Sequence, residues 1–379
     1  MLRRTFVKDL MILASVAPTL RNHPPAAAAS SPVVDITAAH IPRWRGFNLQ
    51  GQFPWPGHPY DGPAFDEFDF NTMAEWGFDF ARLPLSYWVW GSRDDWSVIR
   101  EEPLKQIDRA VDLGKQHGVH ININFHRIPG YCINQRELEP ADLFTGTAPQ
   151  RDKALKAATF HWQAFAKRYK GIPNRQLSFD LINEPPKMHS YEGALEERYV
   201  EIVHTLVGAI RQIDPNRLIF ADGMNIGQAP VVGIVDLGLV QSTRGYQPKA
   251  VSHYTATWVP KDEFETFSPP TWPLKDDNGQ LWDRAYLQKV YVDLYKVITD
   301  KGVQVHVGEW GCFNKTPHEV ALAWMTDCLA VWKQAGWGNS LWNLRGAFGV
   351  MDSERADVTY EDYKGHKLDR KMLELLRNA

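Results

Sequence analysis

After residue 40, hydrophobic positions along this 379-residue chain alternate between two patterns. One is a short run rich in β-branched and aromatic residues, which predicts a buried strand, and the other has apolar residues three and four positions apart, which predicts an amphipathic helix. The eight runs that we assign to strands are WRGFNLQG (44–51), FDFARLPL (78–85), GVHININFH (118–126), LSFDLINEP (177–185), RLIFADGMN (217–225), KAVSHYTA (249–256), VQVHVGEWG (303–311) and GNSLWNLRG (338–346).

Helical segments separate these runs. Residues 101–117 place Leu104, Ile107 and Val111 on one apolar stripe. Similar stripes cover residues 154–169, 196–213, 284–301 and 318–335. Strands and helices that alternate eight times predict parallel strands in a closed (β/α)8 barrel. A doubly wound open sheet is the alternative, but the first run is followed by GFNLQGQF, which lacks the G-x-G-x-x-G phosphate turn.

Three predicted loops are unusually long. They follow the first, third and sixth runs and read QGQFPWPGHPYDGPAF, RIPGYCINQRELEPADLFTGTAPQ and TWVPKDEFETFSPPTWPLKDDNGQLW. All three leave the carboxyl ends of strands, where the active sites of barrel enzymes lie. Because they are long and aromatic, we expect them to form the walls of a cleft.

Composition narrows the class of ligand. The chain has 42 basic and 45 acidic residues, a net charge of −3, which gives no electrostatic case for binding nucleic acid or an anionic membrane. It also has 15 Trp, 13 Tyr and 18 Phe. Most of these rings belong to a core, but so many also fit a protein that stacks on flat apolar ligand faces. The three cysteines have no metal-binding spacing and form at most one disulfide.

The N-terminus resembles a twin-arginine export signal. Arg3-Arg4-Thr5-Phe6-Val7-Lys8 is followed by a short apolar stretch and then by PPAAAASS, whose small residues suit cleavage. We therefore predict a removed signal at residues 1–30, a short segment at 31–40 and one catalytic domain at 41–379. The protein would be exported, periplasmic or extracellular, with no membrane insertion in its mature form, and we expect a monomer.

Polar side chains gather at the carboxyl ends of the predicted strands. They are Arg82, His126, Asn183, Glu184, His253, Tyr254 and Glu309, with Trp342 at the end of the last run. A barrel would bring all of them to one mouth whatever their separation in sequence. Two carboxylates there fit glycoside hydrolysis, in which one protonates the leaving oxygen and the other attacks or activates water. We expect these to be Glu184 and Glu309.

The motifs that surround these residues carry a family resemblance. INEPP (182–186), GEWG (308–311), ARLPL (81–85) and NFHRIPG (124–130) together resemble glycoside hydrolase family 5, the cellulase-like barrels with paired glutamates on their fourth and seventh strands. The resemblance covers roughly residues 40–375. It implies a retaining double-displacement mechanism without a cofactor, in which Glu184 is the general acid/base and Glu309 the nucleophile.

The resemblance also implies roles for other residues. Asn183 would bind the sugar 2-hydroxyl, Arg82 would steady the nucleophile, and Trp342 would be a platform under the sugar. His126 and His253 would bind sugar and set protonation around the carboxylates. The family usually has His-x-Tyr at the end of the sixth strand, where the Tyr hydroxyl contacts the nucleophile, but here the sequence is SHYTATW. Either Tyr254 makes that contact or the contact is absent.

Several alternatives stay open at this stage. Arg82 could be an ion-pair partner of Asp180, and His120 with His126 could point to a metal, although no third ligand at fitting spacing is found. The favoured substrate is a β-1,4-glucan polysaccharide or oligosaccharide, by resemblance only. A β-mannanase or an exo-acting β-glycosidase of the same family is the first alternative, and a non-catalytic carbohydrate-binding barrel is the second.

Overall fold

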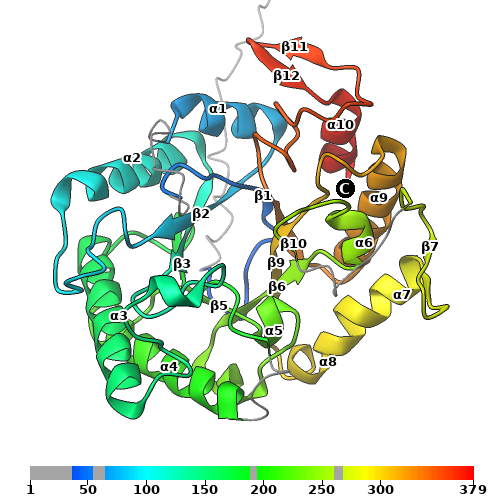
Figure 1. The fold of residues 1–379 in the computed structure, drawn as a ribbon. Helices are drawn as coiled ribbons and strands as arrows, with labels where there is room; N and C mark the ends of the chain where they lie inside the picture. The colour runs from blue at the N-terminus through cyan, green and yellow to red at the C-terminus, as the bar shows by residue number, and fades with distance from the viewer. Residues whose placement is uncertain (1–35, 54–64, 188–193, 260–267) are drawn as a thin grey trace, which may run out of the picture. The chain divides into compact units, whose positions relative to one another are not determined.

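The computed structural model describes residues 36–53, 65–187, 194–259 and 268–379. Eight parallel strands close into a barrel in the order β1-β10-β9-β6-β5-β4-β3-β2, and helices form an outer ring around them (Figure 1). The strands are β1 (Arg45–Asn48), β2 (Phe80–Ser86), β3 (His120–Arg127), β4 (Leu177–Asp180), β5 (Ile219–Asp222), β6 (Val240–Gly245), β9 (Val305–Trp310) and β10 (Gly338–Leu341). The predicted (β/α)8 barrel is confirmed.

The outer ring contains both long helices and shorter pieces. Its helices are α1 (Glu67–Trp76), α2 (Glu101–His117), α3 (Ala148–Arg168), α4 (Ala194–Arg211), α7 (Arg284–Gln288), α8 (Leu294–Thr299), α9 (His318–Gln334) and α10 (Arg370–Asn378). A π-helical turn, Lys289–Asp293, joins α7 to α8. Smaller elements are α5 (Met224–Gly227), α6 (Lys249–Ser252), the 3-10 turns Arg136–Leu138 and Val232–Leu237, and the hairpins β7 (Leu274–Lys275) with β8 (Leu281–Trp282) and β11 (Glu361–Tyr363) with β12 (His366–Leu368). Among the helices of the described ranges, none has the length and apolar character needed to cross a membrane.

Helix α2 shows how the sequence sets these boundaries. Glu101 and Glu102 lie in its first turn and Lys115 and His117 in its last. Acidic groups at the start and basic groups at the end interact favourably with the helix dipole. Gly118 ends the helix in the left-handed region at φ 71°, where a residue without Cβ is favoured. The limits coincide with the stretch predicted from its apolar stripe.

The sixth barrel strand is where the prediction is wrong. KAVSHYTA is not a strand: Lys249–Ser252 form the short helix α6, and the strand is the preceding Val240–Gly245. The strand VQSTRG is fully buried although four of its six residues are polar. Those side chains are satisfied inside the protein, as when Gln241 exchanges hydrogen bonds with the backbone of Val231. Hydrophobicity alone therefore could not identify this strand.

The amino-terminal end of the barrel is filled by aromatic side chains. Trp44, Phe80 and Phe220 belong to one buried cluster there. Two histidines join it: the ring of His120 stacks on Trp44 at 3.8 Å, and that of His306 lies 4.5 Å from Phe80. This end is packed with rings. The polar residues singled out from the sequence lie at the other, carboxyl-terminal end of the strands.

Two expectations fall on parts of the chain outside the described ranges. These are the export signal at residues 1–30 and the central portions of the long loops after β1 and β6, residues 54–64 and 260–267. The long loop after β3 is described and packs inward, since the buried Glu139 accepts hydrogen bonds from Tyr87 and Trp88.

Candidate active site

The two glutamates singled out from the sequence meet at the carboxyl end of the barrel. Glu309 lies in β9 and Glu184 follows β4. One guanidinium contacts both: Arg244 donates from Nε to Glu184 Oε1 at 3.0 Å, and its Nη2 lies 3.3 Å from Glu309 Oε1. The side chains are 15% and 5% exposed respectively, so both carboxyls are shielded from water but reachable.

Arg82 of β2 is fully buried and binds four side chains. It donates from Nη1 to Glu309 Oε1 at 2.6 Å and to Asn48 Oδ1 at 3.0 Å. It also donates from Nε to Asp180 Oδ2 and from Nη2 to Asn183 Oδ1, both at 2.9 Å. The expected contact with Glu309 and the alternative ion pair with Asp180 therefore exist together.

Asn183 joins the polar groups on either side of it. Its Oδ1 accepts hydrogen bonds from Arg82 and Arg244, and its Nδ2 donates to His126 Nε2 at 3.3 Å. Because His126 Nε2 accepts, its ring proton lies on Nδ1, which is 3.9 Å from Glu309 Oε1. Burial and neighbouring arginines hold the pKa of His126 well below its usual range, so the ring is neutral.

Three residues of the site were not found from the sequence: Arg244, Asp222 and Tyr246. Arg244 donates to Asp222 from both terminal nitrogens, with Nη1 at 3.0 Å from Oδ1 and Nη2 bonded to Oδ2. Asp222 ends β5, and its Oδ2 also accepts the backbone N–H of Glu184 at 2.8 Å. The signal that could have found Arg244 is R-G-Y at 244–246, which places a Tyr two residues after a basic side chain.

Tyr246 makes the contact that SHYTATW left in doubt. Its hydroxyl lies 3.3 Å from Glu309 Oε2. Burial raises the pKa of Tyr246 well above its usual value, so the hydroxyl keeps its proton and donates. Both alternatives weighed for this contact, Tyr254 or none, are therefore corrected. The error follows from the misplaced sixth strand, because Tyr246 directly follows the true one.

His253 and Tyr254 lie in the turn after α6 rather than at a strand end. His253 is buried, its Nδ1 lies 2.8 Å from Ser252 Oγ, and its ring packs edge-to-face on Tyr246 at 4.9 Å. Burial lowers its pKa to about 3, so it is uncharged near neutral pH. Tyr254 is half-buried, and a sugar-binding role for either residue stays a prediction.

Trp342 directly follows β10 and packs against His126. Its half-buried ring is stacked on His126, with centroids 5.6 Å apart and 23° between planes. The ring of Phe53 meets it edge-on at 5.6 Å. His126, on which the Trp342 ring stacks, lies 3.9 Å from Glu309, so Trp342 is one side chain away from that carboxylate, with part of its surface open as a platform for an apolar ligand face requires.

Other tryptophans divide between packing and exposure. Trp90 is fully buried, and the indole nitrogens of Trp88 and Trp272 donate to carboxylates that fix them. Trp258 differs, because 52% of its surface is exposed while its ring packs edge-on against Phe313 at 4.9 Å. It offers a second aromatic surface near the mouth.

The environment of Glu184 raises its pKa to about 7. Burial is the largest cause, followed by the negative charge of Glu309, and the guanidinium of Arg244 acts in the opposite direction. A carboxyl of this kind carries a proton over much of the range below neutrality and can donate it. The arrangement therefore provides one proton donor beside one carboxylate held by cations.

The backbone of Glu184 adopts the left-handed region at φ 50°, which is uncommon for a residue with a side chain. Two hydrogen bonds hold it there: its N–H donates to Asp222, and Tyr131 Oη donates to its carbonyl at 2.6 Å. Residues kept in such conformations cluster at functional sites.

The remaining sequence features have structural environments. Cys132, Cys312 and Cys328 are buried and free, so the single disulfide that the sequence allowed does not form. His120 lies at the amino-terminal end of β3, where its Nε2 is 2.7 Å from Ser178 Oγ. Within the described ranges, no group of three or more His, Cys, Asp or Glu side chains is placed to hold a metal ion.

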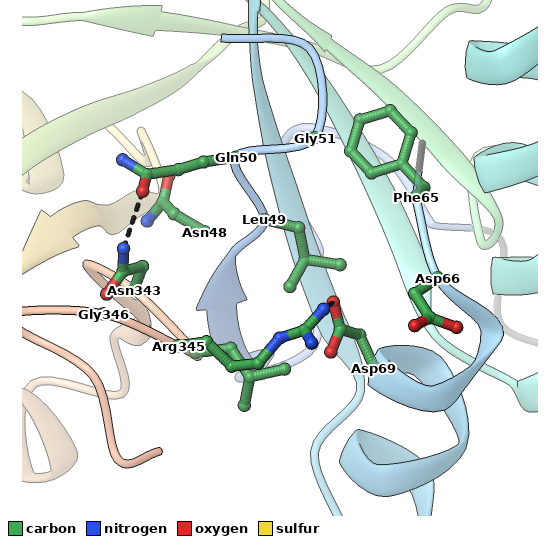
Figure 2. Close-up of a pocket in the computed structure, with 11 residues that line it drawn as sticks. Asn48, Leu49, Gln50, Gly51, Phe65, Asp66, Asp69, Asn343, Arg345 and Gly346 are labelled. Atoms are coloured by element: carbon green, nitrogen blue, oxygen red, sulfur yellow. Dashed lines mark hydrogen bonds and ion pairs between the residues drawn. The ribbon is translucent and has the colours of Figure 1, made fainter. Parts of the chain in front are cut away.

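A cavity of about 410 Å³ opens between the ends of β1 and β10 (Figure 2). Asn48 lines it and also accepts from Arg82, which links this cavity to the carboxylates. Two polar pairs border it: Asn343 Nδ2 donates to Gln50 Oε1 at 2.6 Å, and Arg345 binds Asp69 at 2.7 Å (Figure 2). Amide and charged groups around one hollow suit a ligand rich in hydroxyl groups.

Comparisons with known proteins agree with this geometry. Residues 34–347 match the cellulase family, glycosyl hydrolase family 5. Endoglucanase C from Acetivibrio thermocellus is 25% identical over 324 residues, which covers 78% of this chain and 90% of that protein. Cellodextrinase A from Ruminococcus flavefaciens is 26% identical over 301 residues, covering 77% of this chain and 82% of that protein.

Solved structures give the same result. A crystal structure of a glycoside hydrolase superposes with a TM-score of 0.81 at 37% identity and covers 89% of this chain and 99% of that one. Thermotoga maritima Cel5A in complex with cellobiose has a TM-score of 0.69 at 19% identity, covering 88% and 96%, and supports the fold. The protein is a glycoside hydrolase that belongs to the cellulase family, glycosyl hydrolase family 5.

Proposed function

We propose that this protein cleaves β-glycosidic bonds in a β-glucan with retention of anomeric configuration. The observation that carries the proposal is the asymmetry of the two carboxyls. Glu309 accepts from Arg82 and Tyr246 and lies beside Arg244, so it is surrounded by donors that favour a negative charge. Glu184 touches one cation, and burial raises its pKa to about 7.

Two displacements then follow. In the first, Glu309 attacks the anomeric carbon while Glu184 gives its proton to the leaving oxygen, which breaks the glycosidic bond and leaves a covalent glycosyl-enzyme. In the second, Glu184, now ionised, removes a proton from water as that water attacks the same carbon. Glu309 leaves as a carboxylate, and the starting protonation of both groups is restored. No step needs a metal or an organic cofactor.

The surrounding residues have supporting roles in this proposal. Arg82 and Tyr246 hold Glu309 in place through its two oxygens. Asn183 lies next to the acid and would reach the sugar 2-hydroxyl, and neutral His126 would hydrogen-bond the same sugar. Trp342 would stack under its ring. His253 supports Tyr246 by packing on it.

Family relatives direct the choice of substrate. Two of them carry the names endoglucanase and cellodextrinase, which favours a β-1,4-glucan or its oligosaccharides. Cel5A from Thermotoga maritima has been solved with cellobiose and with mannotriose, so this scaffold also accommodates a mannan-type sugar. A β-mannanase, or an exo-acting β-glycosidase, is therefore the second candidate.

A substrate panel tests the proposal. Wild type and Glu309→Ala are incubated with carboxymethyl cellulose, barley β-glucan, mannan and cello-oligosaccharides of two to six units. We expect wild type to release reducing ends from a glucan and Glu309→Ala to release none above background. Cleavage of mannan alone would move the assignment to the second candidate. Full activity of Glu309→Ala would show that this carboxylate is not the nucleophile.

Export and assembly are further parts of the proposal. Arg3 and Arg4 start a twin-arginine pattern, so cell fractionation of the full chain should place the shortened protein outside the cytoplasm. The variant with Arg3→Lys and Arg4→Lys should stay in the cytoplasm, and export of that variant would count against the signal. Sedimentation of the mature protein should give a monomer.

A further inference from the structure

The end of β6 carries an arginine where the family pattern has a histidine. The family usually places His-x-Tyr there, and this chain has Arg244-Gly245-Tyr246, with Tyr246 making the expected contact to Glu309. A histidine can lose its charge near neutral pH, whereas a guanidinium stays charged at every accessible pH. The cation beside the carboxylates is therefore permanent in this protein.

The contacts of Arg244 cover every donor of its guanidinium. Nε donates to Glu184 at 3.0 Å, Nη2 donates to Asn183 at 2.8 Å and lies 3.3 Å from Glu309, and both terminal nitrogens bind Asp222. The second hydrogen of Nη1 points to Ser242 Oγ at 3.2 Å. The side chain has no exposed surface. Because all of these partners are fixed, they hold the Arg244 guanidinium in a single position.

Asp222 holds both Arg244 and the backbone of Glu184 in place. It forms the bidentate pair with Arg244 and, through Oδ2, accepts the backbone N–H of Glu184. Gly227 passes close by, since a Cβ there would lie 2.8 Å from the Arg244 side chain. Arg82 is anchored in a parallel way on Asp180 but touches Glu309 and not Glu184. Only the Asp222–Arg244 pair, among the described contacts, joins both glutamates.

We propose that Arg244 is a further catalytic residue, a permanent cation that holds both reacting carboxylates, and that Asp222 is a positioning residue that acts through it. The inference rests on the proposed roles of Glu184 and Glu309. The pair carries no net charge while intact, so it orients Glu184 without removing the proton that Glu184 must donate. Loss of either partner leaves the other charge facing that carboxyl.

The sign of each effect follows from the groups that face Glu184. These are Arg244 from β6, Glu309 from β9, Asp222 from β5, and the hydroxyls of Tyr131 and Tyr246 from the loops after β3 and β6. Arg244 lowers the pKa of Glu184, and Asp222 raises it. Asp222→Asn should therefore lower that pKa, and Arg244→Gln should raise it, each by about one unit for a charge at this range.

The experiment measures the pH dependence of kcat/KM on cellotetraose, whose sugar leaving group needs a proton in the first displacement, together with the 13C-carboxyl titration of Glu184. The titration is assigned by difference with Glu184→Gln and needs no activity. We expect the alkaline limb and the titration to move down in Asp222→Asn and up in Arg244→Gln. In the double variant both should return toward wild type while kcat stays low, which separates charge from geometry.

Controls keep the test decisive. Asp214→Asn breaks a similar pair with the buried Arg217, which lies at the other end of the barrel beside the backbone of Leu177, and should move neither readout. If Arg244→Gln does not fold, Arg244→Lys replaces it, with an unchanged limb and a reduced kcat expected. Shifts of Asp222→Asn and Arg244→Gln in the same direction, or no shift in Asp222→Asn, would overturn the inference, as would a moved alkaline limb in Arg244→Lys. Opposite titration shifts in an enzyme that cleaves no β-glycoside would instead overturn the proposed function alone.

Discussion

The two ends of the barrel bury titratable side chains in opposite ways. At the carboxyl end, Arg82 and Arg244 are fully buried and every neighbour that they bind is polar or charged. At the amino end, His120 and His306 are equally buried but lie among the rings of an aromatic cluster. Burial lowers the pKa of both histidines to about 3, so these two rings carry no charge near neutrality.

The difference shows what burial can do with and without partners. Taken alone, burial neutralises a group, as it does for the two histidines. At the carboxyl end, by contrast, carboxylates bind permanent cations, so charged groups persist although they are buried. One further carboxyl there, Glu184, has a pKa of about 7, which suits it to give and take a proton near neutral pH. The ends of the strands thus separate stability from chemistry, as barrels with active sites at the carboxyl end do.

The largest effect should come from Glu184 at the carboxyl end. Glu184→Gln keeps the shape but cannot transfer a proton, so kcat on a natural glucan should fall about 10²- to 10⁴-fold. Aryl glycosides with acidic leaving groups should lose far less in the first displacement, because they need no proton. Steady-state kinetics on both substrate types checks this. Equal losses on the two would contradict the role of general acid.

At the amino end the expected effect falls on stability. Phe80 is 1% exposed and contacts Trp44, His120 and His306. Phe80→Ala should lower the free energy of unfolding by about 3–5 kcal/mol because it leaves a cavity. Chemical denaturation measures that loss. Under conditions in which the variant is folded, its kcat should stay within about twofold of the wild-type value. A large loss of kcat in the folded variant would show that the two ends are coupled.

The two ends should also respond to pH in opposite directions. Glu184 has its folded pKa raised to about 7 from 4.5, so its contribution to stability is lost as pH rises from 4.5 toward 7. His306 has its folded pKa lowered to about 3 from 6.5, so its contribution is lost as pH falls from 6.5 toward 3. Relative to wild type, Glu184→Gln should gain stability toward high pH and His306→Gln toward low pH. Parallel denaturation curves at pH 4 to 8 test both signs, and identical pH dependences would contradict the contrast.

The smallest effect should come from Trp258, whose ring is the exposed aromatic surface near the mouth. If it stacks on a sugar beyond the cleavage point, Trp258→Ala should raise KM for cellohexaose up to about tenfold and leave cellobiose unchanged. Trp272→Ala is the matched control, because that ring is tied to Asp327. A uniform rise in KM for all chain lengths would indicate a general loss of structure.

The fold was predictable where side-chain pattern and burial agree. The stripe of α2 gave its limits, and Asn183, Glu184 and Glu309 were found because strand ends converge in a barrel. Strand β6 was missed because its buried polar side chains have buried partners, which no pattern of hydrophobicity reveals. KAVSHY looked like a strand although Pro248 precedes it and begins a helical turn.

The same error hid three residues of the site. Arg244 and Tyr246 follow from the true strand, and Asp222 becomes informative only once Arg244 is placed beside it. Which two buried charges pair over a long distance depends on strand order and register. Neither can be read from a single sequence. The roles of the residues that were found were suggested by resemblance, whereas their contacts came from the structure.

The assignment of the two carboxylates is tested most directly by trapping the covalent intermediate. The wild-type enzyme is treated with an activated 2-deoxy-2-fluoro-β-cellobioside, digested, and the labelled peptide is sequenced by mass spectrometry. The label should be an ester on Glu309, formed in step with loss of activity. A label on Glu184 or on any other residue, or continued turnover with release of the inverted sugar and no label, would contradict it.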